Sequence, residues 1–337
     1  MATRQSNIEL LRLIAMVMVL ALHANGAAGP FVSRCEATGG SVEFIRLFLE
    51  IACVISVNAF IMISGWFGIR ASFKGLASLF FQLCFYSLCI ALVYKVFIGT
   101  PFSWKDVALS CLGIPYWFIP AYLILYLLSP FLNAFMDKAG QKELLISVVA
   151  FFIAELVYGR FGDQGHFHAG YSALSFIGLY LTAGYLRRHP CRISTLPAWG
   201  LFLLYGLCTL AATGIGYFIG GSMLGGSHSV LDYNHPVMVL SSVFFFLAFT
   251  RLDFQSKAVN WMAASAFAIY LIHMNFLVKQ DYRALMGHLY QAFSPAAALW
   301  VMLGAVLLIA LACILVDKLR ILLWKPAWKR VERWTSR

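Results

Sequence analysis

The stretch Asn7–Gly26, NIELLRLIAMVMVLALHANG, decides the architecture of this chain. It has the length and apolarity of a membrane-spanning helix, because about 20 predominantly apolar residues are needed to cross the hydrocarbon core. It nevertheless contains Arg12 and His23, and an ionisable group at membrane depth costs roughly 3 kcal/mol on insertion scales. The stretch therefore predicts a membrane helix whose polar side chains serve a function.

The composition of the whole chain is typical of a membrane protein. Of its 337 residues 61% are hydrophobic and only 12% are charged, whereas soluble domains are about a quarter charged. We predict an all-α integral membrane protein made of a single transmembrane domain, residues 1–337. Its ten predicted spans are 8–28, 42–68, 76–98, 116–136, 144–159, 171–186, 196–220, 236–250, 261–277 and 295–316.

The basic residues indicate the orientation of these spans. With the N-terminus inside, most of the 25 Lys and Arg residues lie on the cytoplasmic side, as the positive-inside rule requires. Both termini are therefore predicted to be cytoplasmic. The segment 317–337 mixes Trp with Lys and Arg, which predicts a basic amphipathic tail on the surface of the lipid bilayer. Since topology accounts for the net charge of +11, we expect no nucleic-acid partner.

Arg12 and His23 project from the same face of their helix. Eleven residues at 100° per residue make three turns plus about 20°, and the rise of the helix separates the two side chains by about 16 Å. One face thus carries a cation near the cytoplasm and an acid/base group near the opposite surface. In the alternative interpretation, Arg12 reaches the interface and pairs with Glu9, while His23 donates to a neighbouring carbonyl.

A second motif lies at the end of the following span. Ser64–Gly65, beside aromatic residues, permits close backbone approach, and the basic residues Arg70 and Lys74 follow on the cytoplasmic side. Such a pair could hold phosphates. It could equally belong to an ordinary positive-inside loop.

Two further motifs are aromatic or contain histidine. Trp117 begins the aromatic-rich stretch YWFIPAYLILYLLSP, which Pro130 closes and which by itself indicates a membrane interface and core. Tyr270 and His273 stand at i and i+3 inside a late span. A single histidine on such a helix commonly has a structural role.

Together these features resemble the acyltransferase-3 family of integral membrane acyltransferases. The residues that carry the resemblance are Arg12 and His23, Ser64–Gly65–Trp66–Phe67 with Arg70 and Lys74, Trp117–Phe118 leading to Tyr126 and Pro130, and Tyr270–Leu271–Ile272–His273. The chain departs from the family pattern after the Ser-Gly stretch, where family members often have several arginines and a proline. Here Trp66 takes the place of a Phe, and one Arg and one Lys follow without a proline.

The resemblance implies an O-acetyltransferase of the bacterial inner membrane. Such an enzyme moves an acyl group, usually acetyl, from cytoplasmic acetyl-CoA to a hydroxyl of a cell-envelope glycan or glycolipid, such as an O-antigen, other lipopolysaccharide or an exopolysaccharide. Acetyl-CoA is then a substrate, and we expect no metal or prosthetic group.

We assign roles to the candidate residues on this basis. His23 is the general base, because histidine with an unperturbed pKa of about 6.5 suits proton transfer near neutral pH. Arg12, Arg70 and Lys74 are expected to bind the donor. The candidates for contacting the acceptor or the oxyanion are Asn58, Trp117, Tyr270 and His273. Arg46 and Glu50, at i and i+4, are expected to form an ion pair that is structural or shapes the acceptor end.

Two histidine-containing loops give weaker signals. His166 and His168 lie beside Asp163, but a pair of histidines without clear further ligands is a poor metal site. His228, Asp232 and His235 follow a Gly-rich stretch of an outer loop that could touch the acceptor. His228 and Asp232 are one residue closer than in the His-x4-Asp motif of glycerolipid acyltransferases.

Two alternative functions remain open at this stage. A transporter or flippase of a polysaccharide or lipid-linked precursor would use buried Arg and His for binding, but the sequence shows no inverted repeat. In the other large family of membrane acyltransferases, His273 would be catalytic and His23 expendable. A lipid or small-molecule acceptor, a longer acyl group, a covalent acyl-histidine and the oligomeric state are also left open.

Overall fold

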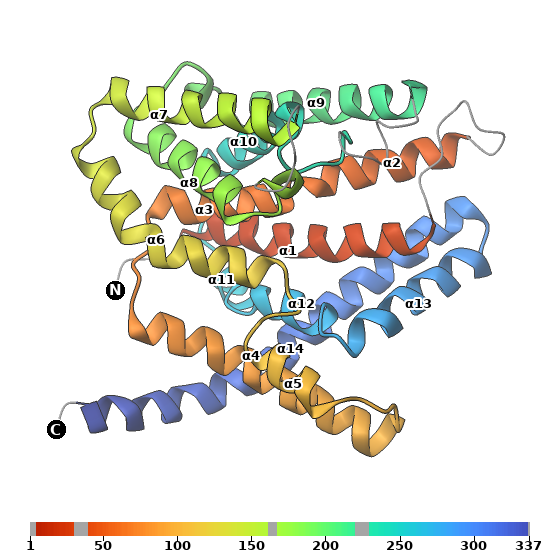
Figure 1. Cartoon of the computed structure of the whole chain (residues 1–337). Helices are drawn as coiled ribbons and strands as arrows, with labels where there is room; N and C mark the ends of the chain where they lie inside the picture. Colours follow the sequence, from red (N-terminus) through yellow and green to blue (C-terminus); the bar gives the residue numbers. More distant parts are fainter. Residues whose placement is uncertain (1–4, 30–39, 161–166, 220–228, 336–337) are drawn as a thin grey trace.

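The computed structural model describes residues 5–29, 40–160, 167–219 and 229–335, and this part of the chain is helical throughout, without a strand (Figure 1). The fold class predicted from the sequence is confirmed. The helices are α1 (Ser6–Ala27), α2 (Ser41–Val54), α3 (Ser56–Phe67), α4 (Phe73–Val93), η1 (Tyr94–Ile98), α5 (Trp104–Cys111), α6 (Phe118–Lys138), α7 (Gln141–Ala154), η2 (Glu155–Arg160), η3 (His168–Gly170), α8 (Ala173–Arg188), η4 (Ile193–Thr195), α9 (Ala198–Ile219), α10 (Pro236–Thr250), α11 (Lys257–Ala263), α12 (Ala266–His273), α13 (Val278–Ala292) and α14 (Pro295–Thr335).

Helix α1 lies at the centre of the bundle (Figure 1). It packs against α2, α3 and the late helices α10 to α14. Small residues permit this close packing, since Ala15 and Ala24 are almost completely buried. The helix that carries Arg12 and His23 is therefore the element around which the rest of the chain is arranged.

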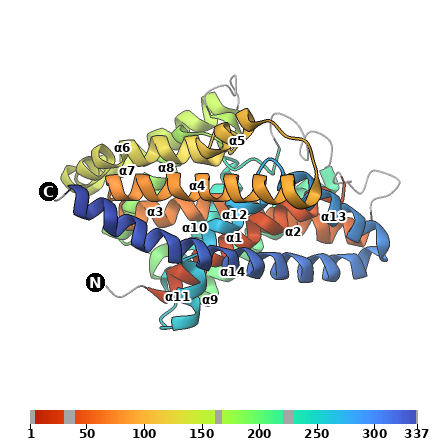
Figure 2. The ribbon, with the colours of Figure 1, turned by 90° about the horizontal axis from the view of Figure 1, so that it is seen from below.

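The lengths of the helices show a protein that crosses a membrane several times. Six helical segments of the described residues are long and apolar enough to span, and the bent pair of α11–α12 with α13 would make a seventh. Helices α7, α8 and α10 have 14, 16 and 15 residues, which at about 1.5 Å per residue is less than the roughly 30 Å hydrocarbon core. The count of ten spans stays a prediction. Helix α1 begins and α14 ends on the same side of the bundle (Figures 1 and 2), but the cytoplasmic placement of that side also stays a prediction.

A sharp bend separates α12 from α13. The two helices make an angle of 90°, and Asn275 in the bend is fully buried. Its side chain accepts a hydrogen bond from the Leu277 amide at 3.1 Å and donates one to the Tyr116 hydroxyl at 3.4 Å. Irregular backbone at membrane depth is tolerated where such partners satisfy it. The bend places His273 at the end of α12 and turns α13 across the end of α1.

The contact between α3 and α8 depends on a glycine. A Cβ atom on Gly65 would overlap the backbone of Tyr180, so only glycine permits this approach. The Tyr180 hydroxyl accepts from the Ile69 amide at 2.8 Å and donates to Asn133 at 2.6 Å. Asn133 in turn donates to the Ile69 carbonyl at 2.9 Å. These bonds fix the loop that carries Arg70.

The C-terminal helix α14 crosses α4 (Figures 1 and 2). Asp317 and Arg320 are buried and form an ion pair, and the Tyr86 hydroxyl of α4 donates to Asp317. The amphipathic tail predicted to begin at Asp317 is thus part of the continuous helix α14. The part of α14 that is apolar enough to span a membrane is Pro295–Trp324.

Candidate active site

His23 and His273 form a hydrogen-bonded pair at the centre of the candidate site. The Nδ1 atom of His23, one turn before the end of α1, lies 3.0 Å from the Nε2 atom of His273, the last residue of α12. The ring centroids are 5.2 Å apart. The sequence presented the two histidines as alternatives for catalysis, but the structure joins them in one site.

The partners of His273 determine which nitrogen of each neutral ring carries a proton. The Nδ1 atom of His273 contacts the carbonyl oxygen of Ile269. A carbonyl can only accept, so this Nδ1 carries the proton and Nε2 of His273 is an acceptor. His23 must then donate through its own Nδ1. Its Nε2 is therefore left with a free lone pair and can accept a proton.

The histidine pair lines a cavity of about 270 Å3. The residues that line this cavity, called here the outer cavity, are Leu22, His23, Gly26, Glu50, Trp117, His273, Met274, Lys279, Tyr282 and Arg283. Glu50 is largely buried and accepts a hydrogen bond from Asn25 at 2.8 Å. The Tyr282 hydroxyl donates to the Leu20 carbonyl at 2.7 Å, which fastens α13 to α1.

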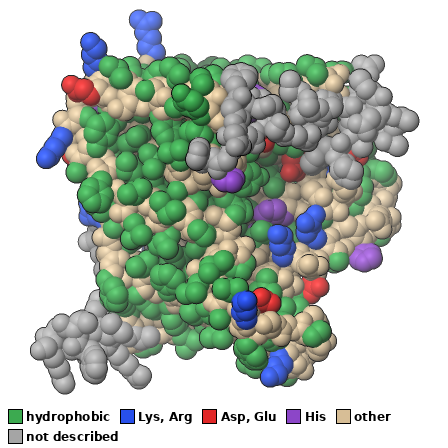
Figure 3. All heavy atoms as spheres, viewed as in Figure 1, with side chains coloured by type: hydrophobic (Ala, Val, Ile, Leu, Met, Phe, Trp, Pro, Cys, Tyr) green, Lys and Arg blue, Asp and Glu red, His purple; other side chains and the backbone are tan. Residues whose placement is uncertain are grey.

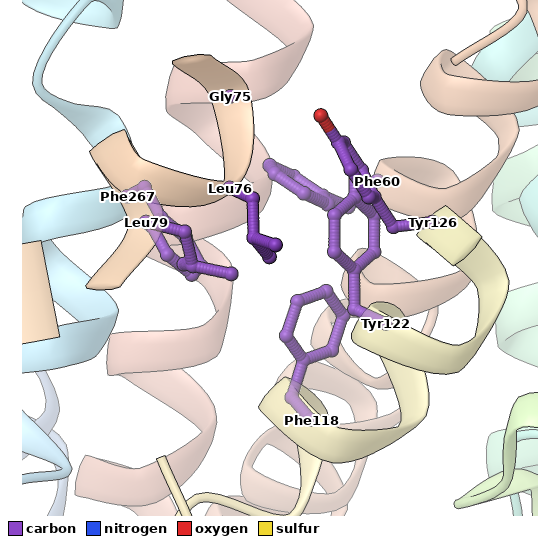
Figure 4. A pocket seen from close by; sticks show the side chains of 8 residues that line it. All are labelled: Phe60, Gly75, Leu76, Leu79, Phe118, Tyr122, Tyr126 and Phe267. Carbon is purple, nitrogen blue, oxygen red and sulfur yellow. The ribbon is translucent and has the colours of Figure 1, made fainter. Parts of the chain in front are cut away.

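A second cavity, the aromatic cavity, has a volume of about 230 Å3 and lies between α3, α4, α6 and α12 (Figure 4). Its lining residues are Phe60, Gly75, Leu76, Leu79, Phe118, Tyr122, Tyr126 and Phe267. The Tyr126 hydroxyl accepts from the Ser72 amide at 2.8 Å and donates to the Ser72 carbonyl at 3.0 Å. A Cβ atom on Gly75 would overlap this hydroxyl. The aromatic cavity therefore lies directly beside the loop of Arg70 and the first turn of α4.

A third, small cavity of about 20 Å3, called here the neck, shares lining residues with both of the others. It shares Phe60, Phe118 and Phe267 with the aromatic cavity. It shares His23 and Trp117 with the outer cavity. The side chain of His23 thus lines both the neck and the outer cavity.

Tyr270 also lines the neck. Its side chain is buried, and its hydroxyl makes no hydrogen bond of normal geometry with the described residues. Buried polar groups are almost always hydrogen-bonded, and an exception calls for an explanation. A hydroxyl that lines the neck together with His23 and donates no hydrogen bond to the described residues is suited to donate to a bound substrate.

The three expected donor-binding residues lie at the other end of α1, in different environments. Arg12 is partly exposed and pairs with both carboxylate oxygens of Glu9 at 2.8 Å, which confirms the pairing expected at i,i+3. It also lies close enough to interact electrostatically with Tyr122 of the aromatic cavity. Arg70 and Lys74 are exposed, and the Lys74 ammonium lies 5.1 Å from the centre of the Trp328 ring. No contact between Arg12 and these two side chains is present among the described residues.

Arg46 and Glu50 interact electrostatically but do not form the direct ion pair expected from their i,i+4 spacing. Arg46 instead forms its salt bridge within the described residues with Glu43, at 2.8 Å, although both Arg46 and Glu50 are buried. Asn25 connects the two expected partners, because its amide donates to the Arg46 carbonyl and to Glu50. The Arg46 guanidinium donates to the Asn25 and Gly29 carbonyls at 3.1 and 2.9 Å. Glu50 is thereby left facing the outer cavity.

The other two acceptor candidates occupy distinct positions. Asn58 is buried and donates to the Tyr233 carbonyl at 2.9 Å, so it holds the polypeptide that follows the Gly-rich stretch. Trp117 stacks on the Tyr233 ring, with centroids 5.9 Å apart, and contacts Tyr171 at 4.6 Å. Trp117 therefore forms an aromatic wall that the neck and the outer cavity share.

Of the loop histidines, His168 and His235 lie within the described residues. The Nδ1 atom of His235 accepts from the Val237 amide at 3.3 Å and caps α10. His166, Asp163 and His228 lie outside the described residues. Among the residues that the structure does describe, no group of three or more His, Cys, Asp or Glu side chains could hold a metal ion.

Sequence reasoning missed Asn25, Lys279 and Arg283 as site residues. Asn25 follows His23 by two residues and gives no signal of its own. The i,i+4 spacing of Lys279 and Arg283 does indicate a shared helix face. Only the bend after His273, however, brings that face to the histidine pair.

The fold and the site define a multi-pass membrane protein with a hydrogen-bonded histidine pair that lines a cavity. The acyltransferase-3 family model, described as an acyltransferase domain, matches residues 5–317. The chain therefore belongs to the acyltransferase-3 family and is a membrane acyltransferase, as the motifs of the sequence predicted. No curated protein and no solved structure matches the chain.

Proposed function

We propose that this protein is an O-acetyltransferase of the bacterial inner membrane. It moves the acetyl group of cytoplasmic acetyl-CoA to a hydroxyl of a cell-envelope glycan on the other side. The observation that carries this proposal is the neck at His23, which shares lining residues with two different cavities, the aromatic cavity beside the loop of Arg70 and the outer cavity beside α13. A donor and an acceptor can then meet at one imidazole without sharing an entrance.

The donor enters through the aromatic cavity. Arg70, Lys74 and Arg12 lie at that end and are suited to the phosphates and polar arm of CoA. The helical distance of about 16 Å between Arg12 and His23 is of the same order as the length of a pantetheine arm. The thioester therefore reaches the neck while the nucleotide stays at the entrance.

His23 acts as the general base. Its free Nε2 takes the proton of the acceptor hydroxyl as the hydroxyl oxygen attacks the thioester carbonyl carbon. The new C–O bond forms, the carbonyl oxygen becomes an oxyanion, and the C–S bond then breaks. The leaving CoA thiolate takes the proton from His23 and departs as free CoA. His23 is thereby neutral again, and the enzyme is back in its starting state.

His273 positions this base. It accepts the Nδ1 proton of His23 and is itself oriented by the Ile269 carbonyl. A base oriented by a third group is the usual arrangement for acyl transfer. Because the Ile269 carbonyl cannot take up a proton, no proton passes from His273 to Ile269. His273 therefore holds His23 in one tautomer and does not carry its proton away.

Tyr270 is the best-placed donor for the oxyanion. Its unpaired hydroxyl lines the neck, and a preorganised donor at the developing charge is commonly the largest single contribution to catalysis. Asn58 is less suited, because its amide already donates to the Tyr233 carbonyl.

The test is the transfer of radiolabelled acetyl from acetyl-CoA to envelope glycan in membranes that contain the wild type or His23→Gln. We expect His23→Gln to lose transfer by about a hundredfold or more, while acetyl-CoA binding to the purified protein stays unchanged. Loss of acetyl-CoA binding in the variant, or full transfer activity, would overturn the assignment of His23. Transport of glycan without any need for acyl-CoA would overturn the proposed function as a whole.

A further inference from the structure

We propose that the outer cavity selects an anionic acceptor, a glycan that bears a carboxylate or phosphate group, through Lys279 and Arg283. The proposal rests on the proposed function, since it names the chemical class of the acceptor at the same site.

Both cations line the path to the histidine pair. Lys279 and Arg283 stand one helical turn apart on α13, so their side chains share a face. They line the outer cavity, and with Met274 they also line an adjoining cavity of about 450 Å3. Both are near enough to interact electrostatically with the His23 ring. Figure 3 shows basic and histidine side chains close together on this face of the molecule, in the region of α12 and α13.

The carboxylates near these two cations accept hydrogen bonds from other residues. Asp281 lies between the two cations in sequence, but it accepts a hydrogen bond from the Tyr94 hydroxyl of η1 at 2.5 Å. Glu50 lines the outer cavity and is held by Asn25. Among the described residues, neither Lys279 nor Arg283 forms a salt bridge.

Two exposed cations at the mouth of a cavity create a local positive potential that raises the concentration of anions there. The planar guanidinium of Arg283 suits a carboxylate or a phosphate in a bidentate contact, and Lys279 adds a flexible point charge. A neutral glycan would not use either charge. The chemistry of the cavity wall thus favours an acidic sugar or a sugar phosphate.

The experiment measures binding without acyl transfer. The purified full-length protein is placed in phosphatidylcholine nanodiscs, and the binding of a fluorescent galacturonic acid oligomer is compared with that of a galactose oligomer of equal length. The test variant is Lys279→Gln/Arg283→Gln. The matched control is Lys138→Gln/Lys142→Gln, which removes the same charge from exposed residues that line none of these cavities.

We expect the wild type and the control to bind the acidic oligomer about tenfold tighter than the neutral one, with a preference that weakens as salt is added. The test variant should bind both oligomers equally. Equal binding of both oligomers by the wild type would overturn the proposal, as would an unchanged preference in the test variant.

Two further measurements test whether another anion, the donor or a lipid headgroup, binds Lys279 and Arg283 instead. If acetyl-CoA displaces the acidic oligomer, the cations bind the donor and the proposal fails. If nanodiscs with phosphatidylglycerol abolish the preference, the cations bind lipid headgroups and it fails as well. Because binding does not need the base, His23→Gln should keep the preference, so failure of the proposed function and failure of this inference remain distinguishable.

Discussion

The Nδ1 atom of His23 and the Nε2 atom of His273 lie 3.0 Å apart, although 250 residues separate them in the sequence. The two rings are therefore one unit, and the loss of activity after an alanine substitution at either one would not tell which is the base. The hydrogen-bond order does distinguish them, because both ring nitrogens of His273 have protein partners, whereas the Nε2 atom of His23 keeps a free lone pair.

Substitution of His273 by glutamine should be milder than substitution by leucine. The side-chain oxygen of glutamine can accept the Nδ1 proton of His23, whereas leucine leaves that proton without a partner. We expect His273→Leu to lower kcat for acetyl transfer by about a hundredfold, and His273→Gln to recover at least part of that loss. If His273→Gln is as inactive as His273→Leu while His23→Gln retains activity, His273 is the base and the roles are reversed.

Removal of the Tyr270 hydroxyl should reduce catalysis without reducing stability. The hydroxyl donates no hydrogen bond to the described residues, so Tyr270→Phe leaves no protein acceptor without its donor. We expect kcat to fall by about a hundredfold, with an unchanged KM for acetyl-CoA and an unchanged Tm. In the control Tyr282→Phe, the Leu20 carbonyl loses its donor, and stability should fall by about 1 kcal/mol. A normal kcat in Tyr270→Phe would remove Tyr270 from the mechanism.

The neck should set the length of the acyl group. Val57 lines it, so Val57→Ala widens the path between the aromatic cavity and His23. In competition between butyryl-CoA and acetyl-CoA, we expect the variant to favour butyryl by up to roughly fourfold per extra methylene relative to the wild type. Val54→Ala is the matched control, because Val54 is buried but lines neither the neck nor either cavity. Equal selectivity in both variants would contradict a limiting neck.

Gly65 should be a packing residue and not a ligand. Gly65→Ala forces a Cβ atom against the backbone of Tyr180, and such overpacking costs about 1–3 kcal/mol. We expect a lower Tm for the detergent-solubilised protein. In the control Gly206→Ala, no atom lies within 4 Å of the added Cβ, so Tm should not fall. Unchanged stability in Gly65→Ala would contradict a packing role for this glycine.

Features that depend on one helix could be predicted from the sequence. Apolarity and composition predicted the all-helical membrane class, although not the number of spans, and the turn of 100° per residue placed Arg12 and His23 on one face of α1. The pairing of Arg12 with Glu9 follows from the same local rule. Arg46 shows the limit of this local rule, because Glu43 and Glu50 both stand within about one helical turn of it. Its salt bridge is with Glu43, and tertiary contacts with Asn25 favour that choice.

Features that depend on long-range geometry could not be predicted. The 90° bend between α12 and α13 has no Pro or Gly to mark it, and it is stabilised by Asn275 and Tyr116, which are far apart in the sequence. Without this bend, Lys279 and Arg283 would continue along a span and would not face the histidine pair.

The neck also bears on the barrier function of the membrane. With a volume of about 20 Å3 and a lining that is mostly aromatic and aliphatic, it is too small and too apolar for hydrated ions to pass. An acyl group that enters from one end and leaves on an acceptor at the other would cross the bilayer while both of its carriers stay behind. A neck of this size holds about one water molecule, so a thioester can occupy it only when the surrounding side chains move apart. The acyl donor itself would then open a barrier that is otherwise closed to ions.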